Sequence, residues 1–151
     1  MSFAQFEREF KLSIKKAMKA AEKTIRESAI ELFTDIIQDT PVGDPSIWKS
    51  DNVPSGYIGG QLRGNWQTTL NTPAASEINR LQRGGNGPAT QETKSGTAGY
   101  DLKDTIYFAN QRPYAGRVED GWSTQAPVGM VKTNVIRWNR IVEARARKNR
   151  T

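Results

Sequence analysis

The sequence predicts an α+β fold in a single domain, residues 1–151, with a long N-terminal helix and a C-terminal helix packed on a small antiparallel β-sheet. Three observations lead to this prediction. Apolar residues recur every three or four positions through residues 1–39, two later stretches alternate apolar and polar residues, and residues 128–147 return to helical spacing. A chain of this length suits one domain, because such a core buries roughly two thirds of the unfolded surface.

The first helix is predicted over residues 1–39. Its apolar positions are Phe3, Phe6, Phe10, Ile14, Ala17, Ala21, Ile25, Ala29, Leu32 and Ile36. Such a helix is roughly 50 Å long, which exceeds the diameter of a compact domain of this size, so part of it is expected to project. The three phenylalanines lie at its start, and we expect them to bury against a neighbouring subunit.

A loop insert is predicted over residues 41–60. Pro41 ends the helix, because it lacks an N–H group and disfavours helical geometry at the residue before it. Trp48 and Tyr57 lie in the insert among prolines and glycines. Exposing both aromatic side chains to water would be unfavourable, so we expect them to be ordered against a partner.

The sheet is expected within residues 61–127. The stretch 66–70 alternates apolar and polar residues in the pattern of a half-buried strand. A second strand is predicted over 104–110, with Ile106 and Phe108 on one face.

Three further segments of this region are predicted from composition. Residues 61–64 are expected to form a short turn or helix, and residues 74–83 are helix-like. The Gly-rich segment 84–99 is expected to be a mobile loop or a long hairpin connection.

The stretch RPYAGRVEDGWSTQAPVGM, residues 112–130, combines aromatics, glycines, prolines and charges. We interpret it as a structural corner between two helices: a short helix or turn that places Val118 on the core and ends at Gly121. Trp122 is expected to fill a groove. For both Tyr114 and Trp122, a place in the core of their own subunit and a contact between subunits remain open.

The net charge of +6 is concentrated at the C-terminus. Residues 137–151 hold six basic residues and one acidic residue, a net charge of +5, which leaves +1 for the rest of the chain. Two interpretations remain open: a solvated helix end favoured by the helix dipole, or a surface that docks on an acidic protein or on nucleic acid.

The composition argues against an enzyme. The chain has no Cys and no His, so it lacks thiolate nucleophiles, the commonest general base and the usual zinc ligands. Glu119 and Asp120 are adjacent, and adjacent side chains point in different directions. Residues 84–88 lack the Lys-Ser/Thr ending of a phosphate loop. We therefore expect no catalysis, cofactor or metal site.

No membrane segment is expected, because charges at Glu7, Arg8 and Glu9 interrupt the apolar run that a signal peptide needs, and no run of 18 apolar residues exists.

The order of several short motifs resembles the minor tail-completion (neck) family of tailed bacteriophages. The motifs are TPVGD, GGQLRGNW and NQRPYAGRVEDGWSTQAPVGMV, followed by a terminal helix. The matching positions are Pro41, Val42, Gly43, Gly60, Leu62, Arg63, Trp66, Asn110, Pro113, Tyr114, Ala115, Val118, Glu119, Gly121, Ala126, Pro127 and Gly129. The sequence departs from the family pattern in the insert 41–60 and in the segment 84–99.

The resemblance implies a virion structural protein at the head–tail junction, made in the host cytoplasm and forming a ring that joins tail to head. It implies a homo-oligomer of six copies, with twelve as the alternative, between head-completion or connector proteins and tail-terminator or tail-tube proteins. Genome DNA would pass through the channel without specific recognition. The competing hypothesis is a small basic nucleic-acid-binding protein that acts through its C-terminal Arg/Lys tail.

Contacts with other subunits or partners are expected from three groups of residues: the first helix, the loop insert with the corner, and the basic tail. These residues are Phe3, Phe6, Phe10, Trp48, Tyr57, Arg63, Tyr114, Trp122, Arg145, Arg147, Lys148 and Arg150.

Overall fold

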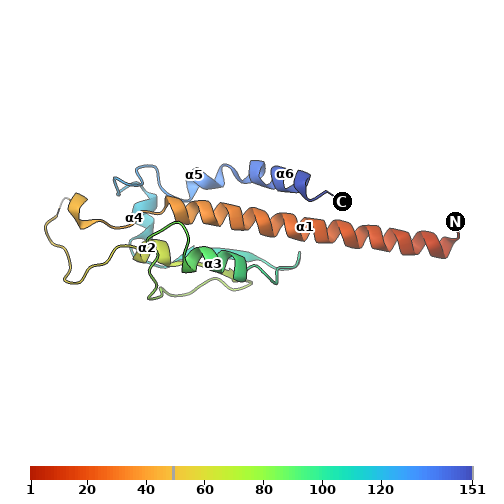
Figure 1. The fold of residues 1–151 in the computed structure, drawn as a ribbon, viewed down its shortest axis with the longest axis horizontal. Helices are drawn as coiled ribbons and strands as arrows, with labels where there is room; N and C mark the ends of the chain where they lie inside the picture. The colour runs from red at the N-terminus through yellow and green to blue at the C-terminus, as the bar shows by residue number, and fades with distance from the viewer. Residues whose placement is uncertain (49, 151) are drawn as a thin grey trace.

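The computed structural model describes residues 1–48 and 50–150, and the fold is α+β, as the sequence predicts (Figure 1). Lys49, within the insert, lies outside the described residues. The elements in chain order are α1 (Phe3–Asp39), a 3-10 turn (Pro45–Ile47), α2 (Gln61–Gly64), β1 (Trp66–Leu70), α3 (Pro88–Ser95), β2 (Ile106–Asn110), α4 (Ala115–Glu119), α5 (Lys132–Val135) and α6 (Trp138–Lys148).

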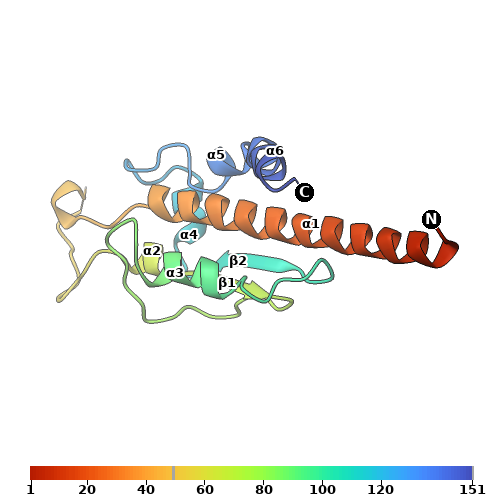
Figure 2. The same cartoon turned by 45° about the vertical axis from the view of Figure 1, so that its right-hand side comes forward.

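Helix α1 is the long helix that the apolar spacing predicts, and its N-terminal half projects from the body (Figures 1 and 2). Ser2 begins it with a capping box, in which its hydroxyl accepts from the N–H of Gln5 and the Gln5 side chain accepts from the N–H of Ser2. Every residue from 1 to 19 is exposed, whereas Thr24, Ser28, Leu32 and later positions are buried. The expected projection is therefore confirmed.

The two-stranded antiparallel sheet packs against one flank of the buried half of α1. Trp66 pairs with Asn110 and Leu70 with Ile106, so the predicted alternation places Trp66 and Phe108 on the same face. Phe108 stacks on Trp66 with ring centres 4.4 Å apart and on Phe33 of α1 at 4.1 Å. This aromatic stack joins the sheet to the long helix.

The C-terminal helix packs mainly along α1, on the side away from the sheet (Figures 1 and 2), rather than on the sheet as expected. The physical reason is a row of carboxylates on α1 that faces basic residues of the C-terminal region. Arg137 pairs with Asp35 at 2.7 Å, and Arg145 pairs with Glu31 at 2.7 Å.

The predicted helix over 128–147 is divided into α5 and α6, and its first residues are not helical. Gly129 has φ of +87°, which is outside the right-handed helical region. The carboxylate of Glu119 then accepts the N–H groups of Met130, Val131 and Lys132, so regular helix starts only at Lys132.

The segment 74–83 has no regular secondary structure, contrary to the prediction of a helix, because its polar groups bond to residues 64–66 at the junction of α2 and β1. Asn65 accepts the N–H of Ile78 at 2.8 Å. The guanidinium of Arg80 donates to the carbonyls of Gly64 and Trp66 and pairs with Glu92 of α3. At the edge of β1, the Arg80 side chain thus satisfies the Trp66 carbonyl, which a third strand would otherwise pair with.

The segment 84–99 contains helix α3, so the prediction of a loop was wrong there. Pro88 occupies the first turn, where its missing N–H is tolerated. The Gln82 side-chain oxygen accepts the N–H of Ala89 at 2.9 Å. The buried face carries Thr90 and Thr93, whose hydroxyls are satisfied within the segment.

Deleting residues 1–10 should leave the thermal unfolding midpoint of the monomer within about 2 °C of that of the full chain, because the deleted side chains are exposed and do not pack against the body of the subunit. Circular dichroism at a concentration where both proteins are monomeric measures the midpoint. If the three phenylalanines belonged to the core, each would contribute roughly 1.5 to 3 kcal/mol, and the midpoint would fall by many degrees.

Candidate functional site

The motif segments on which the family resemblance rests meet at the C-terminal end of α1, and Thr40 lies at their centre. Its side chain is fully buried. The hydroxyl donates to the carbonyl of Ile36 at 2.7 Å and accepts the indole N–H of Trp66 at 2.7 Å. Thr40 thus ends the helix and bonds it directly to the first residue of β1.

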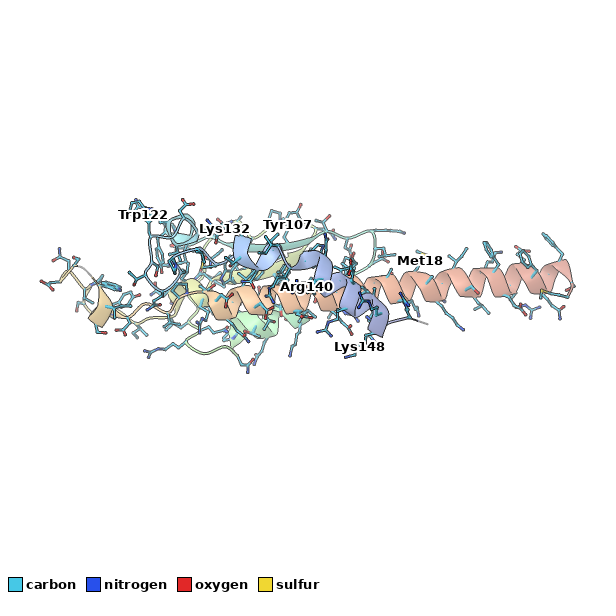
Figure 3. The ribbon with its side chains drawn as sticks, turned by 90° about the horizontal axis from the view of Figure 1, so that it is seen from above. Met18, Tyr107, Trp122, Lys132, Arg140 and Lys148 are labelled. Carbon is cyan, nitrogen blue, oxygen red and sulfur yellow. The ribbon has the colours of Figure 1, made fainter. Side chains whose placement is uncertain are left out.

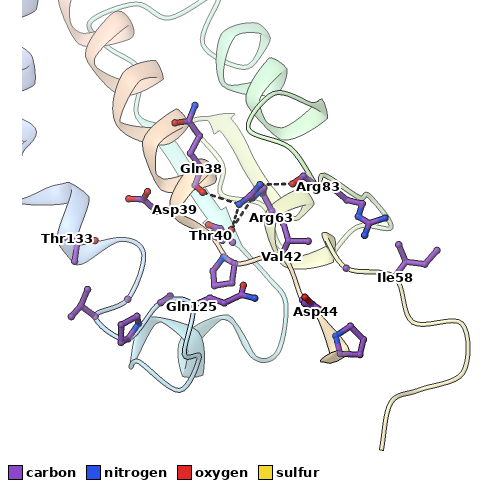
Figure 4. Close-up of a pocket in the computed structure, with 18 of the residues that line it drawn as sticks. Gln38, Asp39, Thr40, Val42, Asp44, Ile58, Arg63, Arg83, Gln125 and Thr133 are labelled. Carbon is purple, nitrogen blue, oxygen red and sulfur yellow. Dashed lines mark hydrogen bonds between the residues drawn. The ribbon is translucent and has the colours of Figure 1, made fainter. Parts of the chain in front are cut away.

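Arg63 caps the same helix end from α2 (Figure 4). Its guanidinium donates to the carbonyl of Thr40 at 2.8 and 3.0 Å, to that of Gln38 at 3.0 Å and to that of Arg83 at 2.7 Å. Burial lowers the pKa of Arg63, and the charge of Asp39 opposes that shift. The expected role of Arg63 at an interface is not what its contacts show, because they lie within the subunit.

The stretch 112–130 forms the predicted corner. Helix α4 ends at Glu119, and Gly121 follows with φ of +86°. Burial of the Glu119 carboxyl group would raise its pKa, but the N–H groups of Val131, Lys132 and Met130 outweigh that effect and lower it. A Cβ atom at Gly129 would lie 2.5 Å from the Glu119 carbonyl oxygen. The turn chemistry of this stretch therefore builds a tight connection between α4 and α5.

Beside the corner lies a cleft of about 850 Å³, which we call the aromatic cleft. Its aromatic lining is Trp48, Tyr57, Tyr114 and Trp122, and its aliphatic lining includes Ile47, Leu62 and Val118.

The four aromatic side chains of the cleft differ in what covers them. Trp48 and Tyr57 meet edge to face with ring centres 4.8 Å apart, and both are half-buried. Tyr114 packs against the core. Trp122 (Figure 3) is 73% exposed on the rim, and the guanidinium of Arg117 lies over its ring. Of the two places left open for Trp122, the core of its own subunit is therefore excluded.

A second exposed apolar surface lies on the projecting part of α1, far from the cleft. Phe3 is 80% exposed, and Phe6 and Phe10 are more than half exposed, with the last two rings 5.9 Å apart. Met18 lies on the bare part of the helix beyond the end of α6 (Figure 3). The structure thus separates the predicted interface aromatics into two groups, one at each end of the molecule (Figure 1).

The basic tail contains residues in different environments. Arg145 is part-buried and bonds to Glu31 of α1, so it belongs to the packing of the subunit. Arg147 forms an exposed pair with Glu143 at 3.6 Å. Lys148 (Figure 3) and Arg150 are exposed.

Sequence reasoning missed Thr40 and the role of Glu119. Thr40 precedes the helix-ending Pro41, which is a recognisable position for a residue that closes a helix through its hydroxyl. In the sequence, Glu119 stands out only as one of two adjacent carboxylates, a pattern that could indicate an acid–base site. In the structure its carboxylate accepts backbone N–H groups at the start of α5, which is a structural role. No sequence signal identified that distant partner.

The described residues include no group of three or more His, Cys, Asp or Glu side chains placed to hold a metal ion. Within the same residues, no helix is both long and apolar enough to cross a membrane. No family model, curated protein or solved structure matches the chain.

Replacing Arg63 by Met should lower the free energy of unfolding by about 2 to 3 kcal/mol, because three backbone carbonyls lose charged donors. Urea denaturation measures this change. Arg83→Met is the matched control, since that side chain is exposed, and it should change the free energy by less than about 0.5 kcal/mol. Equal effects of the two substitutions would contradict the capping role of Arg63.

Glu119→Gln should lower the free energy of unfolding at pH 7 by about 1 kcal/mol, because the amide replaces a charged cap. The pKa of Glu119 is lowered from 4.5 in the folded state, so its contribution is present above pH 4.5 and is lost as pH falls through the folded value. The difference between the two proteins should therefore vanish in acid.

Urea denaturation of the parent and Glu119→Gln proteins at pH 7 and in acid measures that difference. Asp120→Asn, at the exposed neighbouring carboxylate, should show little effect at either pH. A difference between parent and Glu119→Gln that stays constant with pH would exclude the charged cap.

Proposed function

We propose that this chain is a structural protein of a tailed-phage virion, and that copies of it form a ring at the head–tail junction around the DNA channel. Two lines of support lead to this proposal. The ordered motifs resemble the minor tail-completion (neck) family. Residues of those motifs also contact one another in space: Arg63 bonds to the residue before Pro41, and Asn110 donates to the carbonyl of Leu62 at 2.7 Å.

One observation supports a ring in particular: the subunit has two unlike apolar surfaces at opposite ends. A surface that pairs with a different surface of the next copy makes a head-to-tail contact, and such contacts close into rings when the rotation between copies allows it. Six copies, with twelve as the alternative, follow from the family setting. The neighbours in the virion would be head-completion or connector proteins and tail-terminator or tail-tube proteins.

The basic tail fits a contact with a neighbouring protein better than a grip on the passing genome. Each phosphate held by Lys or Arg would retard DNA, whereas a permanent joint gains from charge complementarity. Lys148, Arg150 and Arg140 are exposed and available for this role. Arg147 is exposed but pairs with Glu143, and Arg145 is bonded to α1. Docking that depends on the tail should therefore respond mainly to Arg140, Lys148 and Arg150.

Particles of the source phage should contain this chain, and particles assembled without it should show filled heads and separate tails. Joining fails in that case because the ring that bridges the two parts is missing. Mass spectrometry of purified virions tests the first statement. Negative-stain electron microscopy of a null mutant, with and without added purified protein, tests the second.

Infectious, fully joined particles from the null mutant would contradict the proposal. The nucleic-acid-binding alternative predicts a different result: the isolated chain binds DNA with an affinity that falls steeply with salt, and Lys148→Glu together with Arg150→Glu abolishes the binding.

A further inference from the structure

We propose that the projecting start of α1 from one copy docks in the aromatic cleft of the next copy. The inference deepens the ring proposed above and rests on it for the setting, but it makes a separate statement about which two surfaces meet. The occupant of the cleft is a second copy of this chain, through the helix face that carries Phe3, Phe6 and Phe10.

The helix face presents an exposed apolar stripe that a partner could cover. Phe3, Phe6 and Phe10 lie within about 60° of one another around the helix axis, at 100° per residue, so their rings form one stripe. All three are more than half exposed in the subunit. Aromatic side chains bury roughly 150 to 250 Å² each when covered, so three of them supply a substantial apolar contact.

The cleft is the matching concave surface. Its volume of about 850 Å³ lies in the range that holds sizeable ligands, and its walls are mainly aromatic and aliphatic side chains. Trp122 lies exposed at the rim, and the Trp48–Tyr57 pair forms part of the wall. Phenylalanine rings entering this space would meet aromatic faces and edges in the geometries that such pairs favour.

The two surfaces cannot meet within one subunit. The cleft lies beside the C-terminal end of α1 and the phenylalanines lie at its N-terminal end, with roughly 50 Å of continuous helix between them. The described helix has no break that would let it fold back. Contact between them therefore requires two copies.

Charge in the surroundings favours the same pairing. The projecting part, residues 3–19, holds five basic and two acidic side chains, a net charge of +3. The charged side chains that line the cleft, Asp44 and Arg117, balance each other, whereas the segments around it, residues 39–60 and 113–126, hold five acidic and two basic side chains, a net charge of −3. The opposite net charges of the projecting part and these segments favour their approach, whereas two projecting helices side by side would repel each other.

Disulfide trapping tests the contact, since the chain has no native cysteine. One protein carries Ser13→Cys, beside the phenylalanine stripe, and a second carries Thr124→Cys, on the cleft wall. Mixed and oxidised, they should form the 13–124 dimer. Leu12→Cys is the matched control: it lies on the far side of the helix from the stripe and should give at most a tenth of that yield.

A charge in the stripe tests the docking energy. Phe10→Glu in the Ser13→Cys protein should reduce the 13–124 yield at least tenfold, because it puts a carboxylate into an apolar cleft. Leu12→Glu, the same kind of change on the far side, should leave the yield unchanged. Both side chains are exposed, so circular dichroism should show the monomer fold intact.

Four outcomes would overturn the inference. They are no 13–124 product at any protein concentration, products only between two position-13 cysteines, equal trapping from position 12, and binding of the helix to anionic lipid vesicles in place of the cleft. If the 13–124 dimer forms in solution but the protein is absent from virions, the docking proposal stands and the proposed neck function is contradicted. If the protein is required for joining but the 13–124 dimer never forms, in solution or in particles, the neck function stands and the docking proposal is contradicted.

Discussion

The rest of the structure depends on how the C-terminal end of α1 is closed. A helix end exposes carbonyl groups that need partners, and here Thr40 and Arg63 supply them. The same Thr40 hydroxyl accepts the indole N–H of Trp66, so the cap of the helix is also the attachment of the sheet. Because the cap and the attachment share atoms, the direction of α1 relative to β1 is determined at this point, and the corner and the aromatic cleft are positioned from it.

Along one continuous face of α1, the type of side chain differs between the part that the subunit covers and the part that it leaves exposed. From Thr24 onward it meets the C-terminal region, and carboxylates such as Glu31 and Asp35 bond to arginines of that region. Before residue 20 the same helix carries aromatics flanked by lysines, and nothing in the subunit covers them. The acidic half is complementary to the basic tail of its own chain, and the basic half would repel that tail.

Periodicity predicted the parts of the fold whose burial is apolar, and it failed where burial is polar. The long helix and the strands around Trp66 and Phe108 have the expected spacing. Helix α3 was missed because its buried face consists of threonines that bond within the segment, and residues 74–83 were misassigned because Arg80 bonds to β1. Of the predicted contact residues, the phenylalanines and Trp122 are exposed as an interface requires. Arg63 and Arg145 are part-buried and bond within the subunit. Local patterns in the sequence could not predict this, because the partners, Thr40 and Glu31, are distant in the chain.

The projecting part of α1 has to remain helical without tertiary packing, and short isolated helices are marginal in water. Its sequence meets that requirement locally. The capping box at Ser2 satisfies the first backbone donors, Lys11 pairs with Glu7 one turn away, and most residues between are good helix formers. The remainder of the helix, held by the body, removes the cost of nucleation. The phenylalanines are therefore presented on a preformed rod, so that binding orders few additional residues and loses little conformational entropy.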